Sequence, residues 1–168
     1  MQSLFRRVIL AFSTVPTAKD WLQAVVLLLI FALIYLPIGF TLGFLNIDVQ
    51  TSWQTIVSVA VGAFFMPALL EECGFRALLL PHSTEAILLS KRWLLSSLSW
   101  CLFVGYHLHP FVPPFFRTPA FLSGAGLLGI ICTISYLKSG SVWTPIAIHW
   151  LIVVAWLLCF GGLEKFQG

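Results

Sequence analysis

Residues 55–80 read TIVSVAVGAFFMPALLEECGFRALLL, an apolar run that is interrupted by two adjacent carboxylates and an arginine. A bilayer core takes roughly 20 apolar residues in a helix, so this run is long enough to cross it. A charged side chain in mid-bilayer costs roughly 2.5–3.5 kcal/mol on insertion scales and normally faces a partner or a cavity. The stretch therefore predicts a membrane helix with Glu71 and Glu72 turned toward a polar site.

The composition of the whole chain supports a membrane protein. Of its 168 residues, 60% are hydrophobic and 9% are charged, and the mean hydropathy is +1.00. A soluble domain has roughly 45–50% apolar and about 25% charged residues. We therefore predict an all-α polytopic membrane protein. The net charge of +3 comes with no basic block, which argues against a nucleic-acid partner.

Five apolar stretches are separated by loops that hold most of the other charges and many of the Pro, Gly and Ser residues. The predicted spans are residues 21–45, 55–80, 93–108, 121–137 and 143–160. The apolar run after Arg6 and Arg7 is too short for a signal peptide. We therefore predict that residues 1–20 form a cytoplasmic or interfacial segment and that residues 21–168 form one transmembrane domain.

The basic residues predict the orientation of these spans. If the spans alternate, one side holds six basic residues and the other holds two, Arg117 and Lys165. The first group is Arg6, Arg7, Lys19, Lys91, Arg92 and Lys138. Because Lys and Arg are enriched in cytoplasmic loops, the N-terminus is predicted to be cytoplasmic.

The cysteines show no metal-binding pattern. Cys73, Cys101, Cys132 and Cys159 each lie in one of the last four predicted spans, without CxxC spacing. A free cysteine usually packs as a small apolar residue. The sequence thus predicts four buried free thiols and no zinc site.

The acidic pair needs partners for its two carboxylates. Glu72 and Arg76 are four residues apart with the acid first, which favours an ion pair along one helix face. Glu71 then has no local partner and must find one on another helix or stay protonated. His107 in FVGYH and His149 in TPIAIHWLIVV are the candidates. Three ionisable residues on three predicted spans indicate one shared polar chamber.

These motifs, in this order, resemble those of the CAAX-protease and bacteriocin-processing (CPBP or Abi) family of glutamic intramembrane proteases, which includes the type II CAAX prenyl endopeptidases. The likeness covers residues 55–160, the last four spans, which would form the catalytic core. The family motifs are EExxxR, FxxxH and Hxxx(N/D). They are matched by Glu71, Glu72 and Arg76, by Phe103 and His107, and by His149 alone in the third motif.

The resemblance implies an intramembrane endopeptidase that needs no metal and no cofactor. It implies that Glu71 activates water as the general base and that His107 orients the water or the leaving group. It assigns His149 to the oxyanion and gives Glu72 and Arg76 a part in shaping the site. The implied substrate is a peptide or membrane protein in the lipid bilayer. It is either a prenylated CAAX C-terminus or an unlipidated leader or tail.

The third motif departs from the family pattern. Val153 stands four residues after His149, where the family has Asn or Asp, and its side chain donates no hydrogen bond. Tyr106, Trp143 and Trp150 are candidate replacement donors. A first alternative is therefore a catalytically weakened member that acts as a membrane scaffold or an immunity-type binding protein.

A second alternative is a metal-dependent membrane hydrolase. Its ligands would be Glu71, Glu72, His107 and His149, although the HExxH spacing of zinc hydrolases is missing. His82 follows Pro81 in a loop and His109 precedes Pro110 at a predicted span end. Neither is expected to take part in the chemistry.

Overall fold

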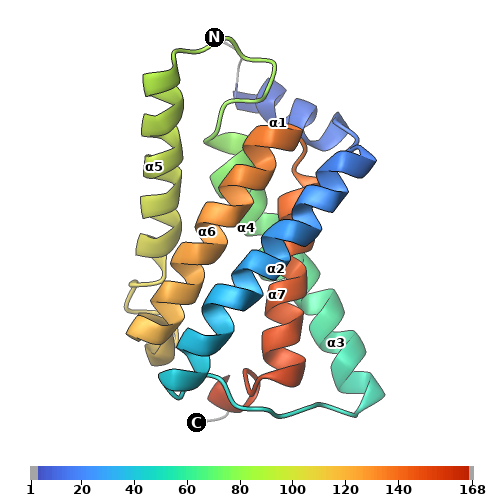
Figure 1. The fold of residues 1–168 in the computed structure, drawn as a ribbon, viewed down its shortest axis with the longest axis vertical. Helices are drawn as coiled ribbons and strands as arrows, with labels where there is room; N and C mark the ends of the chain where they lie inside the picture. Colours follow the sequence, from blue (N-terminus) through green and yellow to red (C-terminus); the bar gives the residue numbers. More distant parts are fainter. Residues whose placement is uncertain (1–3, 167–168) are drawn as a thin grey trace.

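The computed structural model describes residues 4–166, and every regular element in that stretch is helical, which confirms the predicted all-α class. Figure 1 shows one bundle, with α1 at one end and the end of α7 at the other. The α-helices are α1 (Leu4–Ser13), α2 (Ala18–Thr41), α3 (Trp53–Ala63), α4 (Leu70–Glu72), α5 (Leu89–Tyr106), α6 (Pro119–Ser139) and α7 (Trp143–Cys159). The irregular helical segments are η1 (Phe64–Leu69), η2 (Cys73–Leu78), η3 (Pro114–Arg117) and η4 (Glu164–Phe166).

Several helices have the length and composition of membrane spans. Among residues 4–166, three helical stretches qualify: Ala18–Thr41, Trp53–Leu78 and Pro119–Ser139. The α7 helix is also apolar but has 17 residues. The chain is therefore a polytopic integral membrane protein. The total of five crossings and the cytoplasmic side of the N-terminus stay predictions.

The α6 helix lies against α2, α5 and α7 and packs closely through its glycines (Figure 1). A Cβ atom on Gly124 would lie 2.6 Å from the Tyr35 ring of α2, and one on Gly129 would lie 2.9 Å from the Trp100 ring of α5. Small residues allow such contacts between membrane helices, whose association relies on van der Waals packing. This packing brings the backbone of α6 close to the acidic motif.

The predicted span 55–80 is a broken helix. The α3 helix ends at Ala63, and Met66 has extended backbone angles (φ −143°, ψ 115°) before Pro67. Proline has no N–H group and disfavours a helical conformation in the residue before it, so the helical hydrogen bonds are interrupted here. Helical structure resumes through α4 and η2. The break separates the segment that carries Glu71 from α3.

The α5 helix ends at the FxxxH motif of Phe103 and His107. It begins at Leu89, earlier than the predicted residue 93, and His107 caps it with a backbone N–H donated to the Val104 carbonyl at 3.2 Å. The loop that follows contains η3, and its Phe115 side chain packs against the main core. His107 therefore lies where a helix meets an aromatic loop.

The α1 helix is joined to the bundle by polar contacts. Arg7 donates two hydrogen bonds to the Glu85 carboxylate, at 2.7 and 2.8 Å. The Val142 N–H donates to the Ala11 carbonyl at 3.0 Å, beside the start of α7. The opposite face of α1 exposes Phe5 and other large apolar side chains. The separate cytoplasmic or interfacial segment over residues 1–20 stays a prediction.

We predict that Arg7→Gln loosens α1 from the bundle. The change removes a two-point contact to a nearly buried carboxylate, and hydrogen bonds to charged groups contribute about 1.5–3 kcal/mol. The melting temperature in detergent should fall, and limited proteolysis should cut near α1 sooner. Lys91→Gln, at an exposed position, is the control. Unchanged melting and proteolysis of Arg7→Gln would show that the contact does not hold α1.

We also predict that acid weakens this end of the bundle. Burial alone would raise the pKa of Glu85, but hydrogen bonds from Arg7 and the His82 N–H, with the Arg7 charge, lower it below 4.5. Burial lowers the pKa of His82 below 6.5. Both groups bind protons more weakly in the folded state, so stability is lost as pH falls through these values.

The test is the melting temperature as a function of pH. It should begin to fall below about pH 6.5 and fall further below about pH 4.5, the ordinary pKa values of the two groups. Glu85→Gln should flatten the fall at the lower pH, whereas Glu164→Gln, at an exposed acid, should follow the parent curve. Equal slopes in Glu85→Gln and the parent would contradict the assignment.

Candidate active site

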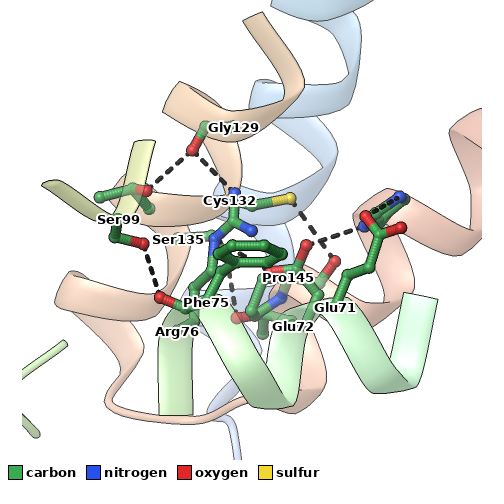
Figure 2. A network of polar contacts seen from close by, with 12 residues as sticks. Glu71, Glu72, Phe75, Arg76, Ser99, Gly129, Cys132, Ser135 and Pro145 are labelled. Carbon is green, nitrogen blue, oxygen red and sulfur yellow. Dashed lines mark hydrogen bonds and ion pairs between the residues drawn. The ribbon is translucent and has the colours of Figure 1, made fainter. Parts of the chain in front are cut away.

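Glu72 is fully buried, and Arg76 compensates its charge. Neither side chain has exposed surface, and Glu72 Oε2 lies 3.1 Å from Arg76 Nε. Arg76 Nη2 donates to the Gly129 carbonyl of α6 at 3.1 Å, and the guanidinium lies 4.5 Å from the centre of the Phe103 ring of α5. Figure 2 shows Arg76 reaching toward Gly129. The predicted ion pair is present, and its arginine links η2 to α6 through Gly129 and to α5 through Phe103.

The other oxygen of Glu72 holds His149 of α7. His149 Nδ1 lies 2.8 Å from Glu72 Oε1. A carboxylate that is ionised beside Arg76 only accepts hydrogen bonds, so Nδ1 carries the proton and donates it. This contact leaves Nε2 of His149 directed to the neighbouring carboxylate, 3.8 Å from Glu71 Oε2. Spacing along the chain predicted the contact of Glu72 with Arg76 but not its second contact with His149.

Glu71 is placed differently from Glu72, although the two are adjacent. Its side chain keeps 11% of its surface exposed. The Tyr106 hydroxyl of α5 donates a hydrogen bond to Glu71 Oε1. Glu71 Oε2 accepts no hydrogen bond from the residues that the structure describes, and it faces His149. One oxygen of Glu71 is thus hydrogen-bonded, and the other is buried without a hydrogen-bond partner among the described residues.

His107 is fixed by its own helix and by aromatic rings. Its Nδ1 donates to the Phe103 carbonyl at 2.8 Å. A neutral ring protonated at Nδ1 leaves Nε2 as a hydrogen-bond acceptor. The ring centre lies 4.2 Å from that of Tyr106 and 5.2 Å from that of Phe121. Phe103, known at first only as a motif residue, therefore positions His107 through its carbonyl and packs against Arg76 through its ring.

The three predicted ionisable residues share one cavity of about 530 Å³. Glu71, Tyr106, His107 and His149 supply most of its polar lining. The rest of the lining is largely aliphatic and aromatic. Its side chains come from α2, α3, α6 and α7, from Phe116 of η3 and from Phe166 of η4. Such an arrangement can hold a water beside a carboxylate and an apolar ligand next to that water.

The other sequence candidates lie elsewhere or are already bonded. Trp143 Nε1 donates to the Phe12 carbonyl at 3.0 Å, and Trp150 Nε1 donates to the Ala60 carbonyl at 2.7 Å. His82 hydrogen-bonds Thr84 in the loop near α1, and the exposed His109 ring accepts from the Phe111 N–H. Within residues 4–166, no group of three or more His, Cys, Asp or Glu is arranged to hold a metal ion.

The prediction of four buried thiols was wrong in part. All four cysteines are free, but only Cys132 is buried, Cys73 and Cys159 are intermediate, and Cys101 is exposed on the outside of α5. In a membrane protein the outer surface faces lipid, so a small apolar side chain is stable there without protein contacts.

We predict that Arg76→Ala destabilises the fold as a whole. The change leaves the buried Glu72 carboxylate without its cationic partner. Removal of one partner of a buried ion pair lowers the free energy of unfolding by about 3–5 kcal/mol. Folded yield and melting temperature in detergent should both drop, whereas Lys138→Ala, at an exposed position of α6, should match the parent. Parental melting of Arg76→Ala would mean that the pair contributes little to stability.

One of three comparisons with known proteins identifies a family for this chain. No curated protein and no solved structure matches the chain. The sequence profile of the family described as "Type II CAAX prenyl endopeptidase Rce1-like" matches residues 51–155. This range covers more than half of the chain and includes Glu71, His107 and His149. The protein therefore belongs to the Rce1-like family of type II CAAX prenyl endopeptidases, a family of intramembrane proteases.

Proposed function

We propose that this chain is a glutamic-type intramembrane endopeptidase in which Glu71 activates a water molecule. The observation that carries the proposal is the position of Glu71 at the polar part of the cavity. One of its oxygens is anchored by Tyr106, and the other faces His149 at 3.8 Å. A carboxylate with one oxygen hydrogen-bonded and the other without a hydrogen-bond partner is suited to accept a proton from a water molecule in the cavity.

The proposed reaction uses the nitrogen atoms that the surrounding contacts leave available. Glu71 Oε2 takes a proton from water while the water oxygen attacks the peptide carbonyl carbon. Nε2 of His107 accepts the second water hydrogen and so orients the attack. His149, anchored to Glu72 through Nδ1, donates to the oxyanion from Nε2 when that atom is protonated. Glu71 then passes its proton to the leaving nitrogen as the C–N bond breaks.

The substrate we propose is a peptide or membrane-protein terminus with an apolar group next to the scissile bond. Apolar side chains such as Phe31, Leu128 and Trp156 line the cavity beyond its polar part. Burial of apolar surface there contributes roughly 25 cal/mol per Å². A prenylated CAAX end would satisfy this chemistry, and so would a hydrophobic leader or tail without lipid.

Val153 supports one alternative. It lines the cavity at the position of the third motif and offers no hydrogen bond to an oxyanion. A chain weakened at this point would bind a membrane partner without cutting it, as a scaffold or immunity-type protein. The same experiments separate the two functions, because a binding protein leaves no protein termini that depend on Glu71.

We predict that Glu71→Gln abolishes cleavage and leaves the fold intact. Loss of a general base lowers rates about 10²–10⁴-fold, whereas a neutral amide of the same shape is cheaper to bury than a carboxylate. Cells with the parent or the variant would be compared by quantitative mass spectrometry of membrane-protein termini. Peptides that span a Glu71-dependent cut, with and without a prenyl group, would then be assayed in proteoliposomes.

The melting temperature of Glu71→Gln should match or exceed that of the parent, and a second variant serves as the activity control. Glu164→Gln, at an exposed acid of η4, should cleave at the parental rate. Absence of any Glu71-dependent terminus, or parental cleavage by Glu71→Gln, would overturn the proposed chemistry. A stronger reaction with the prenylated peptide would assign a CAAX-like substrate, and a stronger reaction without it would assign a leader or tail.

We predict that chelators leave the parental rate unchanged. The proposed reaction activates water with Glu71 and routes no step through a metal. The same proteoliposome assay would be run after exhaustive treatment with EDTA or 1,10-phenanthroline. Inhibition that added zinc reverses would favour the metal-dependent hydrolase instead.

A further inference from the structure

The cavity offers few hydrogen-bond donors for a negatively charged oxygen. Peptide hydrolysis develops such an oxyanion, and loss of one preorganised donor costs about 10²–10³-fold in rate. Val153 lines the cavity one helical turn beyond His149 and donates nothing. His149 supplies one N–H at most, because its Nδ1 is already bonded to Glu72. The other side chains that line the cavity are the next candidates for a second donor.

Most other donors near the cavity are bonded elsewhere or lie too far away. The Tyr35 hydroxyl donates to the Ala120 carbonyl at 3.1 Å. The indole groups of Trp143 and Trp150 donate to backbone carbonyls, as described above. Trp156 has no partner for its Nε1 among the described residues, but it lies seven residues after His149, about 10 Å along α7.

Tyr106 is the hydrogen-bond donor that lies against the proposed base. Its hydroxyl contacts the carboxylate of the proposed base, and the residue lines the cavity and is 38% exposed. The ring stacks on Phe75 with centres 5.8 Å apart, and it also contacts the His107 ring. Packing on two sides fixes the ring, so the hydroxyl stays beside Glu71 while its O–H bond can rotate.

We propose that Tyr106 is a catalytic residue whose hydroxyl is the second oxyanion donor. It would replace the Asn or Asp side chain of the family motif, where this chain has Val153. This inference rests on the proposed function of Glu71. Before the reaction the Tyr106 O–H donates to ionised Glu71. During the attack Glu71 takes the water proton and becomes neutral, while the carbonyl oxygen gains the negative charge.

The change of partner follows from charge. Hydrogen bonds to an ionised acceptor are roughly twice as strong as those between neutral groups. As the charge moves from Glu71 to the oxyanion, the Tyr106 hydroxyl therefore turns to the oxyanion and keeps its own proton. The water O–H bond breaks, and the C–O and Glu71 O–H bonds form. When the C–N bond breaks, the Glu71 proton goes to the leaving nitrogen, and Tyr106 returns to Glu71.

The first test is Tyr106→Phe, which keeps the ring contacts and removes only the hydroxyl. With the peptide identified above in proteoliposomes, kcat should fall about 10²–10³-fold, with KM within about twofold and an unchanged melting temperature. Tyr136→Phe is the matched control, because Tyr136 is buried in α6 and does not line the cavity. Parental kcat in Tyr106→Phe would overturn the inference.

The second test asks whether the lost function is donation to the oxyanion. Val153→Asn in the Tyr106→Phe background introduces an amide donor at the third motif position and should recover at least about tenfold in kcat, part of what one donor contributes. The kcat of Val153→Asn in the parent is measured alongside, and the gain over Tyr106→Phe is compared with it. If Val153→Asn lowers the melting temperature, Val153→Thr, which has the shape of valine, replaces it.

The outcomes separate this inference from the proposed function. An inactive Glu71→Gln with an active Tyr106→Phe would retain the glutamate mechanism and reject Tyr106. An inactive Tyr106→Phe that neither donor at position 153 rescues would also reject the oxyanion role, because the hydroxyl would then act only by positioning Glu71. An active Glu71→Gln would reject the proposed function itself.

Discussion

The buried charge of Glu72 is the constraint on which the rest of the site depends. A carboxylate with no exposed surface is stable only if it is compensated on every side. Arg76 Nε and His149 Nδ1 meet this requirement, at 3.1 and 2.8 Å. Arg76 also bonds the Gly129 carbonyl, so one charge connects η2, α6 and α7. The relative positions of these helices are therefore set by electrostatics as well as by packing.

This network gives the two neighbouring glutamates different environments. Successive residues on a helix point about 100° apart, so Glu72 faces the buried arginine while Glu71 turns to the cavity. Glu72 then anchors His149, which places an imidazole nitrogen beside the Glu71 carboxylate. The structural position of Glu72 and the reactive role that we propose for Glu71 thus belong to adjacent residues, because burial and partners differ between the two positions.

The apolar surface of the molecule has a different cause from its apolar core. Side chains such as Leu33, Leu94 and Phe65 are largely exposed on the outer faces of the helices. In water this would mark a binding surface or an aggregation hazard, but lipid is an apolar solvent. Polar side chains accordingly gather inside, where Ser99 bonds the Phe75 carbonyl and Thr133 bonds the Gly129 carbonyl.

The sequence by itself determined the features that depend on local spacing and composition. Apolar run lengths predicted a polytopic membrane protein, and the four-residue spacing predicted the Glu72–Arg76 pair, because one helical turn brings those side chains together. The motifs, together with the small number of ionisable residues in the predicted spans, indicated Glu71, His107 and His149 as site residues. The structure places these three at one cavity.

The tertiary structure decided the contacts between helices. The bond from Tyr106 to Glu71 and the bond from His149 to Glu72 join residues 35 and 77 positions apart. Such contacts depend on how each helix is rotated about its axis and on its register against its neighbours. Neither quantity follows from spacing along one chain, because close packing at residues such as Gly124 and Gly129 sets both. For the same reason only the assembled bundle showed that Cys101 faces outward.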